Sequence, residues 1–193
     1  YTTLFRSVRN ITLSPFFIEN LKKITTVPID VHLMVNHPED IIPMCLEAGA
    51  DIISFHPETA NNKIFRLLNQ IKDAGKKCGV VLNPATPAES IAEYAHLLDK
   101  VTVMSVDPGY AGQKFIPESL NKIRKLINMR KNNGYHYLTE IDGSCNEKTF
   151  GQIAESGVDV FIVGTSGLFS LHEDVSQAWD RMIEIFQRET VAA

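Results

Sequence analysis

The chain has 193 residues, of which 44% are hydrophobic, and carries a formal net charge of −4. Residues 1–193 are therefore expected to form one domain with a sizeable core. The weakly acidic composition, without a long run of Lys and Arg, argues against nucleic acid as a partner. No apolar stretch reaches the roughly 18 residues of a membrane span. Three widely spaced cysteines without a CxxC pair are typical of reduced thiols, which predicts a cytoplasmic protein.

In chain order, short runs rich in Val and Ile alternate with longer helical patterns. The runs are apolar on both faces, which is typical of strands in a fully covered parallel sheet. The predicted strands are Ile29–Met34, Ile52–His56, Lys77–Leu82, Val101–Val106, Tyr137–Ile141 and Val158–Val163. Each lies between two predicted helices, so the chain reads as about six βα units.

The helices are predicted from their start and stop signals. Ser14-Pro15 is an N-cap followed by Pro at the first helical position, and several helical patterns end at a Gly. The predicted helices are Pro15–Ile24, Pro38–Glu47, Ile64–Ala74, Pro87–His96, Pro117–Asn133, Glu147–Ser156 and Val175–Arg188. A βα repeat of this kind allows a doubly wound open sheet or a (β/α)8 barrel. No GxGxxG follows a strand, which disfavours a dinucleotide-binding sheet.

Polar and small residues gather where the predicted strands end, and in both folds these ends carry the site. The polar residues are His32, His56, Glu58, Asn83, Asp107 and Asp142. The small residues crowd the last three ends and are Gly109, Gly112, Gly143, Ser144, Gly164, Thr165, Ser166 and Gly167. Small residues let several backbone N–H groups approach one anion, so the three loops together predict a phosphate site, although each glycine alone is more typical of a turn.

His32 and Asp142 raise a second hypothesis. A neutral imidazole and a carboxylate suit Zn²⁺, Mn²⁺ or Fe²⁺, and they also suit acid–base chemistry. The structural alternative is that His32 is a hydrogen-bonded core residue and Asp142 a turn residue before Gly143. Two residues are fewer than the four that usually hold such a metal.

Six strand-end motifs resemble one family in order along the chain: "DVHLMV", "HPE", "VLNPATP", "VMSVDPGYAGQKF", "EIDGSC" and "VGTSGLF". They resemble the ribulose-phosphate 3-epimerase family of phosphate-binding (β/α)8 TIM barrels, from about Asn10 to Phe186. The stretches "NITLSPFF", "DGSC" and "GTSGLF" are similar to the branch that acts on D-allulose 6-phosphate. The resemblance implies epimerisation of D-allulose 6-phosphate to D-fructose 6-phosphate, and D-ribulose 5-phosphate is the alternative substrate.

The resemblance also assigns roles. These enzymes deprotonate and reprotonate C3 of a ketose phosphate with two aspartates, while a divalent metal holds the enediolate. It implies that His32 and Asp142 bind the metal (Zn, Mn, Co, Fe or Mg) and the substrate, and that Asp142 is an acid–base residue. Met34 and Met104 would pack beside them. The segment Gly109-Tyr110-Ala111-Gly112 would line the substrate, and the phosphate would be held by Gly143, Ser144, Gly164, Thr165 and Ser166.

The first residues depart from the family pattern. The family's second strand carries an H-x-D-x-M-D-G motif with the other histidine and the other aspartate, and residues 1–9 do not match it. The expected architecture is therefore a barrel that lacks its first two strands, and the expected fragment is inactive. The alternative is a sugar-phosphate-binding barrel without catalysis. A homo-oligomer is left open.

Overall fold

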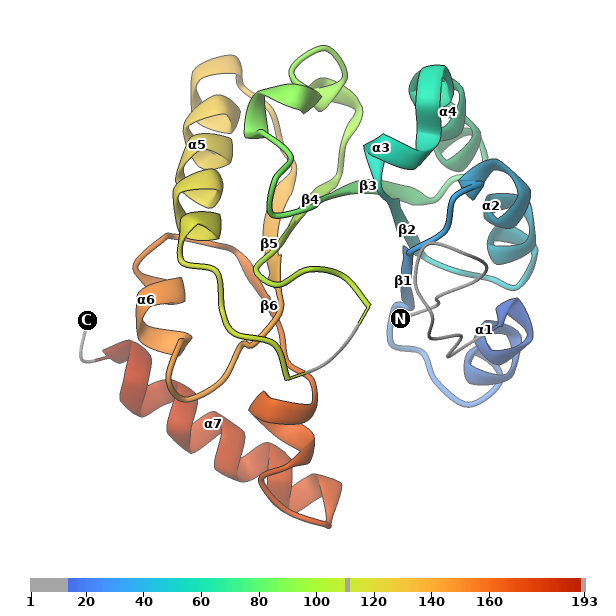
Figure 1. The fold of residues 1–193 in the computed structure, drawn as a ribbon. Helices are drawn as coiled ribbons and strands as arrows, with labels where there is room; N and C mark the ends of the chain where they lie inside the picture. Colours follow the sequence, from blue (N-terminus) through green and yellow to red (C-terminus); the bar gives the residue numbers. More distant parts are fainter. Residues whose placement is uncertain (1–13, 110–111, 192–193) are drawn as a thin grey trace.

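The computed structural model describes residues 14–109 and 112–191, and statements about structure refer to these two ranges. Six parallel strands form one sheet in which they lie side by side in sequence order. They are β1 (Asp30–Leu33), β2 (Ile52–Phe55), β3 (Lys77–Leu82), β4 (Lys100–Met104), β5 (Leu138–Asp142) and β6 (Val160–Ile162). The sheet curls, and helices surround its outer side (Figure 1). An incomplete α/β barrel is what the sequence predicts, and this prediction is confirmed.

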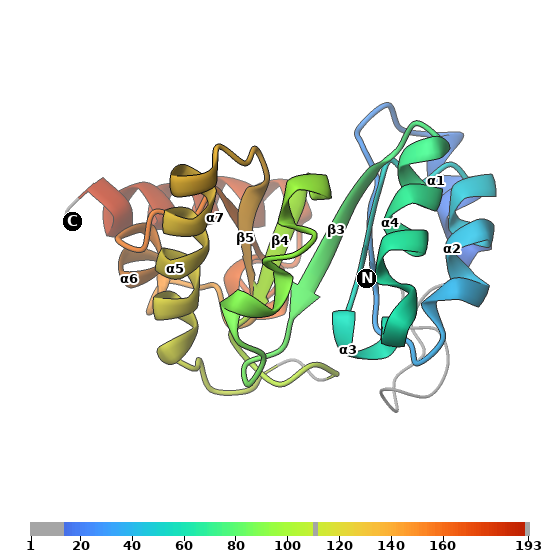
Figure 2. The same cartoon turned by 90° about the horizontal axis from the view of Figure 1, so that it is seen from above.

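One helix precedes β1 and the others follow strands along the chain. Together they cover one face of the sheet, as the view from above also shows (Figure 2). They are α1 (Pro15–Lys22), α2 (Pro38–Glu47), α3 (Pro57–Ala60), α4 (Ile64–Asp73), α5 (Glu118–Asn133), α6 (Phe150–Ala154) and α7 (Val175–Val191). Short turns of 3₁₀-helix lie at Asn61–Lys63 (η1), Ala88–Ile91 (η2) and Ala95–Leu97 (η3), and a π-helix (η4) spans Thr165–Phe169. In the part of the chain that is described, no helix is both long and apolar enough to cross a membrane.

The two faces of the sheet differ in chemistry because side chains alternate along each strand. Outward-facing residues such as Val31, Leu33, Val101 and Val103 belong to the large core that packs against the helices. The intervening residues face the hollow of the curled sheet. There Met34, Val81, Met104 and Val106 form a separate small apolar cluster, and most of the other inward residues are polar.

Local signals explain where several helices start and stop. Pro lies in the first turn of α1, α2 and α3, where its missing N–H costs no hydrogen bond. Helix α5 ends at Gly134, whose backbone is left-handed with φ of 68° and whose N–H donates to Arg130 O. Glycine adopts that conformation without steric cost, so the Gly signal correctly marks this end.

Two predicted helices are wrong in extent. The segment predicted as the helix Pro87–His96 forms η2 and η3 instead, because the backbone at Tyr94 leaves the helical region with φ of −126° and ψ of 7°. The helix predicted at Glu147–Ser156 begins only at Phe150, because Thr149 Oγ1 accepts from the Asn146 N–H and donates to Ser144 O. Both cases show side chains and turns that compete with the regular i to i+4 ladder.

Candidate active site

Two buried histidines contact each other at the carboxyl end of the sheet. His32 lies on the inner face of β1, and His56 follows β2 directly. Their Nε2 atoms are 2.9 Å apart and their ring centroids 5.0 Å apart. The two residues are 7% and 5% exposed. The contact is a hydrogen bond between two imidazoles, so the other ring nitrogen of each side chain faces away from its partner.

Asp142 approaches His32 from the opposite side of the hollow. It is the last residue of β5, while His32 belongs to β1, so the two are separated by three strands in the sheet order. Their atoms Oδ2 and Nδ1 nevertheless lie 3.8 Å apart. The curl of the sheet therefore brings together the two residues that the sequence singled out as a pair.

Burial favours the neutral form of both imidazoles. It lowers the pKa of His32 well below 6.5, and the neighbouring His56 and Lys100 lower this pKa further. Burial also lowers the pKa of His56, and the carboxylate of Glu58 opposes this shift. A neutral imidazole offers one N–H donor and one lone pair. That form can accept a proton or bind a metal ion, whereas the imidazolium can do neither.

Glu58 lies beside the second histidine, in the first turn of α3. Its Oε2 is 3.9 Å from Nδ1 of His56. Its Oε1 accepts hydrogen bonds from Asn83 Nδ2, at 3.0 Å, and from the hydroxyl of Thr86. The carboxylate is thus held in place by the loop after β3, with its second oxygen turned toward His56.

The loops after β4, β5 and β6 are joined by hydrogen bonds. Ser144 Oγ donates to Gln113 O at 2.5 Å. Asn146 Nδ2 donates to Ser144 O at 3.0 Å and to Ser166 Oγ at 3.3 Å. The three loops with the predicted anion-binding residues therefore lie next to one another at the carboxyl end of the sheet.

Close backbone packing in these loops requires small residues. A Cβ on Gly167 would lie 2.1 Å from the carbonyl oxygen of Cys145, and a Cβ on Gly143 would lie 2.7 Å from Val106. Ser144 has a positive φ of 51°. The loop after β5 and the π-helix η4 therefore approach each other through backbone atoms, and only small residues allow this approach.

The predicted site residues fall into two groups. His32 and Asp142 form one, and Gly143 and Ser144 continue directly from Asp142 toward the second, where Gly164, Thr165 and Ser166 open η4. Gly109 and Gly112 flank a part of the loop that the structure does not describe, and the predictions for Tyr110 and Ala111 lie outside the described residues. Their roles in binding and catalysis stay predictions.

Sequence reasoning assigned no role to His56, Glu58 and Asn146. The first two were visible as polar residues at a strand end, in the motif "FHPE". Asn146 lies beyond the "DGSC" motif and gives no sign, from the sequence alone, that its amide joins two loops. All three become apparent only through contacts between separate strand ends.

A divalent metal ion is implied by the resemblance, and the donor atoms present fit part of such a site. Two ligands about 2.0–2.2 Å from one ion lie at most roughly 4.4 Å apart. The 3.8 Å between His32 Nδ1 and Asp142 Oδ2 satisfies this limit. Within residues 14–109 and 112–191, no group of three or more His, Cys, Asp or Glu side chains is placed to hold a metal. The described residues thus fit two ligand positions.

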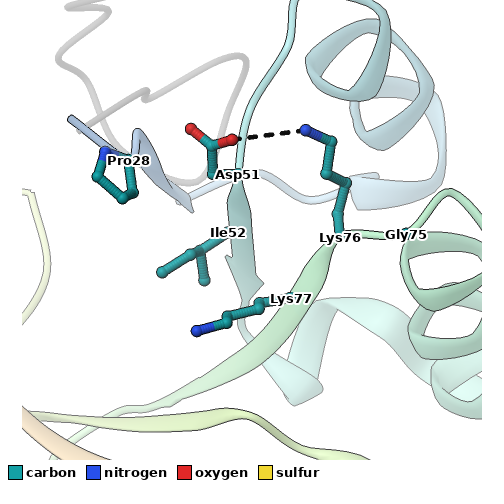
Figure 3. A pocket seen from close by; sticks show the side chains of 6 residues that line it. All are labelled: Pro28, Asp51, Ile52, Gly75, Lys76 and Lys77. Atoms are coloured by element: carbon teal, nitrogen blue, oxygen red, sulfur yellow. Dashed lines mark hydrogen bonds and ion pairs between the residues drawn. The ribbon is translucent and has the colours of Figure 1, made fainter. Parts of the chain in front are cut away.

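A separate cavity opens at the amino end of the strands. It is lined by Pro28, Asp51, Ile52, Gly75, Lys76 and Lys77 (Figure 3). Asp51 there accepts from the Ile29 N–H at 2.8 Å and pairs with Lys22 at 2.9 Å and Lys76 at 3.5 Å. These contacts account for the carboxylate as a structural group, and the cavity lies at the end of the sheet opposite His32 and Asp142.

Comparisons with known proteins identify the chain's relatives. The sequence pattern described as the Ribulose-phosphate 3 epimerase family matches residues 5–169. The chain is 42% identical over 163 residues to a ribulose-phosphate 3-epimerase of Buchnera aphidicola, covering 84% of this chain and 71% of that protein. It is 41% identical to the Escherichia coli K12 protein of the same name, covering 82% and 71%. The Aquifex aeolicus protein, also a ribulose-phosphate 3-epimerase, is 41% identical, covering 88% and 76%.

Solved structures show the same architecture at lower identity. A mutant tryptophan synthase alpha-subunit from Pyrococcus furiosus superposes with a TM-score of 0.63 at 14% identity, covering 91% of this chain and 71% of that one. At this identity the likeness concerns the fold alone, and it is a likeness to a TIM barrel.

Proposed function

Because the chain belongs to the ribulose-phosphate 3 epimerase family, we propose that it binds a ketose phosphate at the carboxyl end of the sheet and that Asp142 moves a proton at C3. One observation carries the proposal. The carboxylate of Asp142 faces His32 across the hollow, 3.8 Å away, and residues 143 and 144 lead directly into the joined loops. The carboxylate and the loops proposed to bind the anion are thereby contiguous.

Each group has a task that follows from its chemistry. Asp142, 4% exposed, removes or returns the C3 proton, since a carboxylate can act as a general base and its protonated form as a general acid. Backbone N–H groups near Gly143, Ser144 and Gly164–Ser166 bind the phosphate and so fix where C3 lies. A divalent metal ion, when bound, supplies positive charge that stabilises the enediolate. His32 and Asp142 would hold it.

For the substrate we propose D-allulose 6-phosphate. The support is the similarity of "NITLSPFF", "DGSC" and "GTSGLF" to the branch that acts on this sugar. D-ribulose 5-phosphate is the second candidate, because the relatives named above are ribulose-phosphate 3-epimerases. A six-carbon substrate places its phosphate one carbon further from C3, so the loops of Ser144 and Ser166 are where the two substrates would differ.

The remaining proposals concern the setting. Cys45, Cys78 and Cys145 are free and buried thiols, which supports a cytoplasmic location. Assembly into a homo-oligomer stays a prediction. A sugar-phosphate-binding barrel without catalysis is the alternative function, and it predicts binding without proton transfer.

Solvent exchange at C3 tests the proposal on the 193-residue chain itself. We would incubate the chain and Mn²⁺ in D₂O with D-allulose 6-phosphate, D-fructose 6-phosphate or D-ribulose 5-phosphate, and follow the C3 proton by NMR. Asp142 reaches one face of C3, and residues 1–13 contain no Asp or Glu for the other. We expect deuterium at C3 of one epimer without inversion, faster for the six-carbon pair.

The outcomes separate the candidates. Faster exchange on D-ribulose 5-phosphate would overturn the substrate proposal. Binding of the sugars without exchange would favour the binding-only barrel. Exchange that persists in Asp142→Asn would show that another group moves the proton.

A further inference from the structure

The contact between His32 and His56 constrains where protons sit. Two ring nitrogens 2.9 Å apart can form a hydrogen bond only if one carries a proton and the other a lone pair. A neutral imidazole carries only one ring proton, so the state of Nε2 also determines whether Nδ1 of the same ring is protonated. If His32 donates from Nε2, its Nδ1 has a lone pair and His56 carries its proton on Nδ1. If His56 donates, both assignments reverse.

A carboxylate stands at each end of this pair. Asp142 Oδ2 is 3.8 Å from Nδ1 of His32, and Glu58 Oε2 is 3.9 Å from Nδ1 of His56. Each carboxylate favours a proton on the nitrogen nearest to it, and the hydrogen bond allows only one of the two nitrogens to have it. Asp142 and Glu58 therefore pull the two imidazoles toward opposite tautomers.

A cation between His32 and Asp142 would settle this competition. A metal ligand must offer a lone pair, so Nδ1 of His32 must be free of a proton. The proton then sits on Nε2 of His32 and is donated to His56, whose own proton sits on Nδ1 beside Glu58. Glu58 is fixed for this role by Asn83 and Thr86.

We infer that Glu58 and His56 are positioning residues that stabilise the His32 tautomer with its proton on Nε2 and its lone pair on Nδ1. The inference rests on the proposed role of His32 as a metal ligand. Partners that orient the histidines of metal sites in this way typically contribute 10- to 100-fold to metal affinity. Glu58 and His56 are not proposed to contact the substrate. Their effect is on the position of the ring proton of His32.

The chain contains its own control, because the motif His-Pro-Glu occurs twice. His37-Pro38-Glu39 begins α2 as His56-Pro57-Glu58 begins α3. In the first copy His37 Nδ1 and Glu39 Oε1 are 3.7 Å apart, and the His37 side chain is 71% exposed. The distance between imidazole and carboxylate is thus nearly the same in both copies, but His37 is a surface residue, whereas His56 is buried against His32.

The test is a tautomer measurement on the whole chain labelled with ¹⁵N-histidine, read from the ring nitrogen shifts of its six histidines. In Glu58→Gln we expect the population of His32 with its proton on Nε2 to fall relative to the unmodified chain at the same pH. Glu39→Gln should leave it unchanged. An unchanged His32 tautomer in Glu58→Gln would overturn the inference, whether or not a metal binds.

Zn²⁺ titration by calorimetry adds a second readout. We expect Glu58→Gln to weaken Zn²⁺ binding by about 10- to 100-fold. His56→Gln should retain much of the affinity, because an amide oxygen can accept the Nε2 proton without help from Glu58. Adding Glu58→Gln to that variant should then change nothing further. Equal losses in both backgrounds would mean that Glu58 has only a structural role.

The Zn²⁺ titration and the tautomer measurement test different claims. An unmodified chain that binds no Zn²⁺ would count against the proposed metal role of His32, while the tautomer shift would still test Glu58. Urea unfolding of each variant shows whether the fold is intact, so a loss of Zn²⁺ binding through unfolding is recognised.

Discussion

The two ends of the hollow both bury charged and polar side chains, but the distances between these side chains and their partners differ. At the amino end, Lys100 pairs with Glu140 at 2.8 Å and with Asp30, and Thr102 Oγ1 donates to Glu140 at 2.7 Å. At the carboxyl end, the distances from His32 to Asp142 and from His56 to Glu58 are 3.8 and 3.9 Å. The first cluster makes direct hydrogen bonds between opposite charges. In the second cluster, each carboxylate lies slightly beyond hydrogen-bond distance from its neighbouring imidazole.

This difference separates stability from function. A buried charge that is fully paired contributes to the fold only while its partner remains, and it has little capacity for other contacts. Asp142 and His32, 3.8 Å apart, lie within the roughly 4.4 Å that can separate two ligands of one ion. The amino end is thus expected to matter for folding and the carboxyl end for chemistry.

The largest expected effect is on proton transfer at the carboxyl end. Asp142→Asn should reduce C3 exchange by about 10²- to 10⁴-fold, since an amide cannot serve as the general base. The free energy of unfolding should change little or rise. NMR exchange rates and urea unfolding of the same sample check both parts. If Asp142→Asn lost stability and kept C3 exchange, Asp142 would matter for folding rather than for chemistry, which contradicts the account.

The amino end should respond in the opposite way. Lys100→Met leaves Glu140, 4% exposed, without its buried cation. Breaking such a pair typically costs about 3–5 kcal/mol of unfolding free energy. Urea unfolding measures this loss. Adding Glu140→Gln should recover part of this loss, because the uncompensated carboxylate is then removed. No recovery would mean that the broken Lys100–Glu140 pair is not the cause of the lost stability.

A smaller effect is expected where the loops of the carboxyl end pack. A Cβ in Gly167→Ala would meet the Cys145 carbonyl, whereas a Cβ on Gly164 has nothing within 4 Å. Overpacking of this kind costs about 1–3 kcal/mol. We expect Gly167→Ala to lower both the unfolding free energy and the affinity for inorganic phosphate, measured by calorimetry. Gly164→Ala is the control for the unfolding free energy alone, because Gly164 is itself a proposed phosphate-binding residue. Equal losses of unfolding free energy in both variants would exclude the backbone contact as the reason.

The last effect is a gradual one, a dependence of stability on pH. Burial lowers the pKa of His32 and His56 below 6.5 in the folded chain. Below pH 6.5 the unfolded chain therefore binds protons that the folded chain does not, and stability falls as the pH falls. Each histidine contributes at most about 1.4 kcal/mol per pH unit. Urea unfolding between pH 7 and 5 should show a shallower fall in His32→Gln, and an unchanged slope would contradict the assignment.

Much of the fold follows from local signals in the sequence. The Val- and Ile-rich runs predict all six strands to within a few residues, because fully covered parallel strands are apolar on both faces. The pairing of His32 with Asp142 was predictable because parallel strands place their carboxyl ends together. The π-helix η4 and the break at Tyr94 were not, since both depend on how loops pack against neighbours. The role of Glu58 depends on a hydrogen bond between strands, which no periodicity reports.

One measurement tests most directly whether the carboxyl end carries the site. The amides of the ¹⁵N-labelled chain would be followed by NMR during a titration with D-allulose 6-phosphate. We expect the largest shifts at Gly143, Ser144 and Gly164–Ser166, where the loops after β5 and β6 are joined. Shifts confined to Asp51, Lys76 and Lys77, around the cavity at the amino end, would contradict the account.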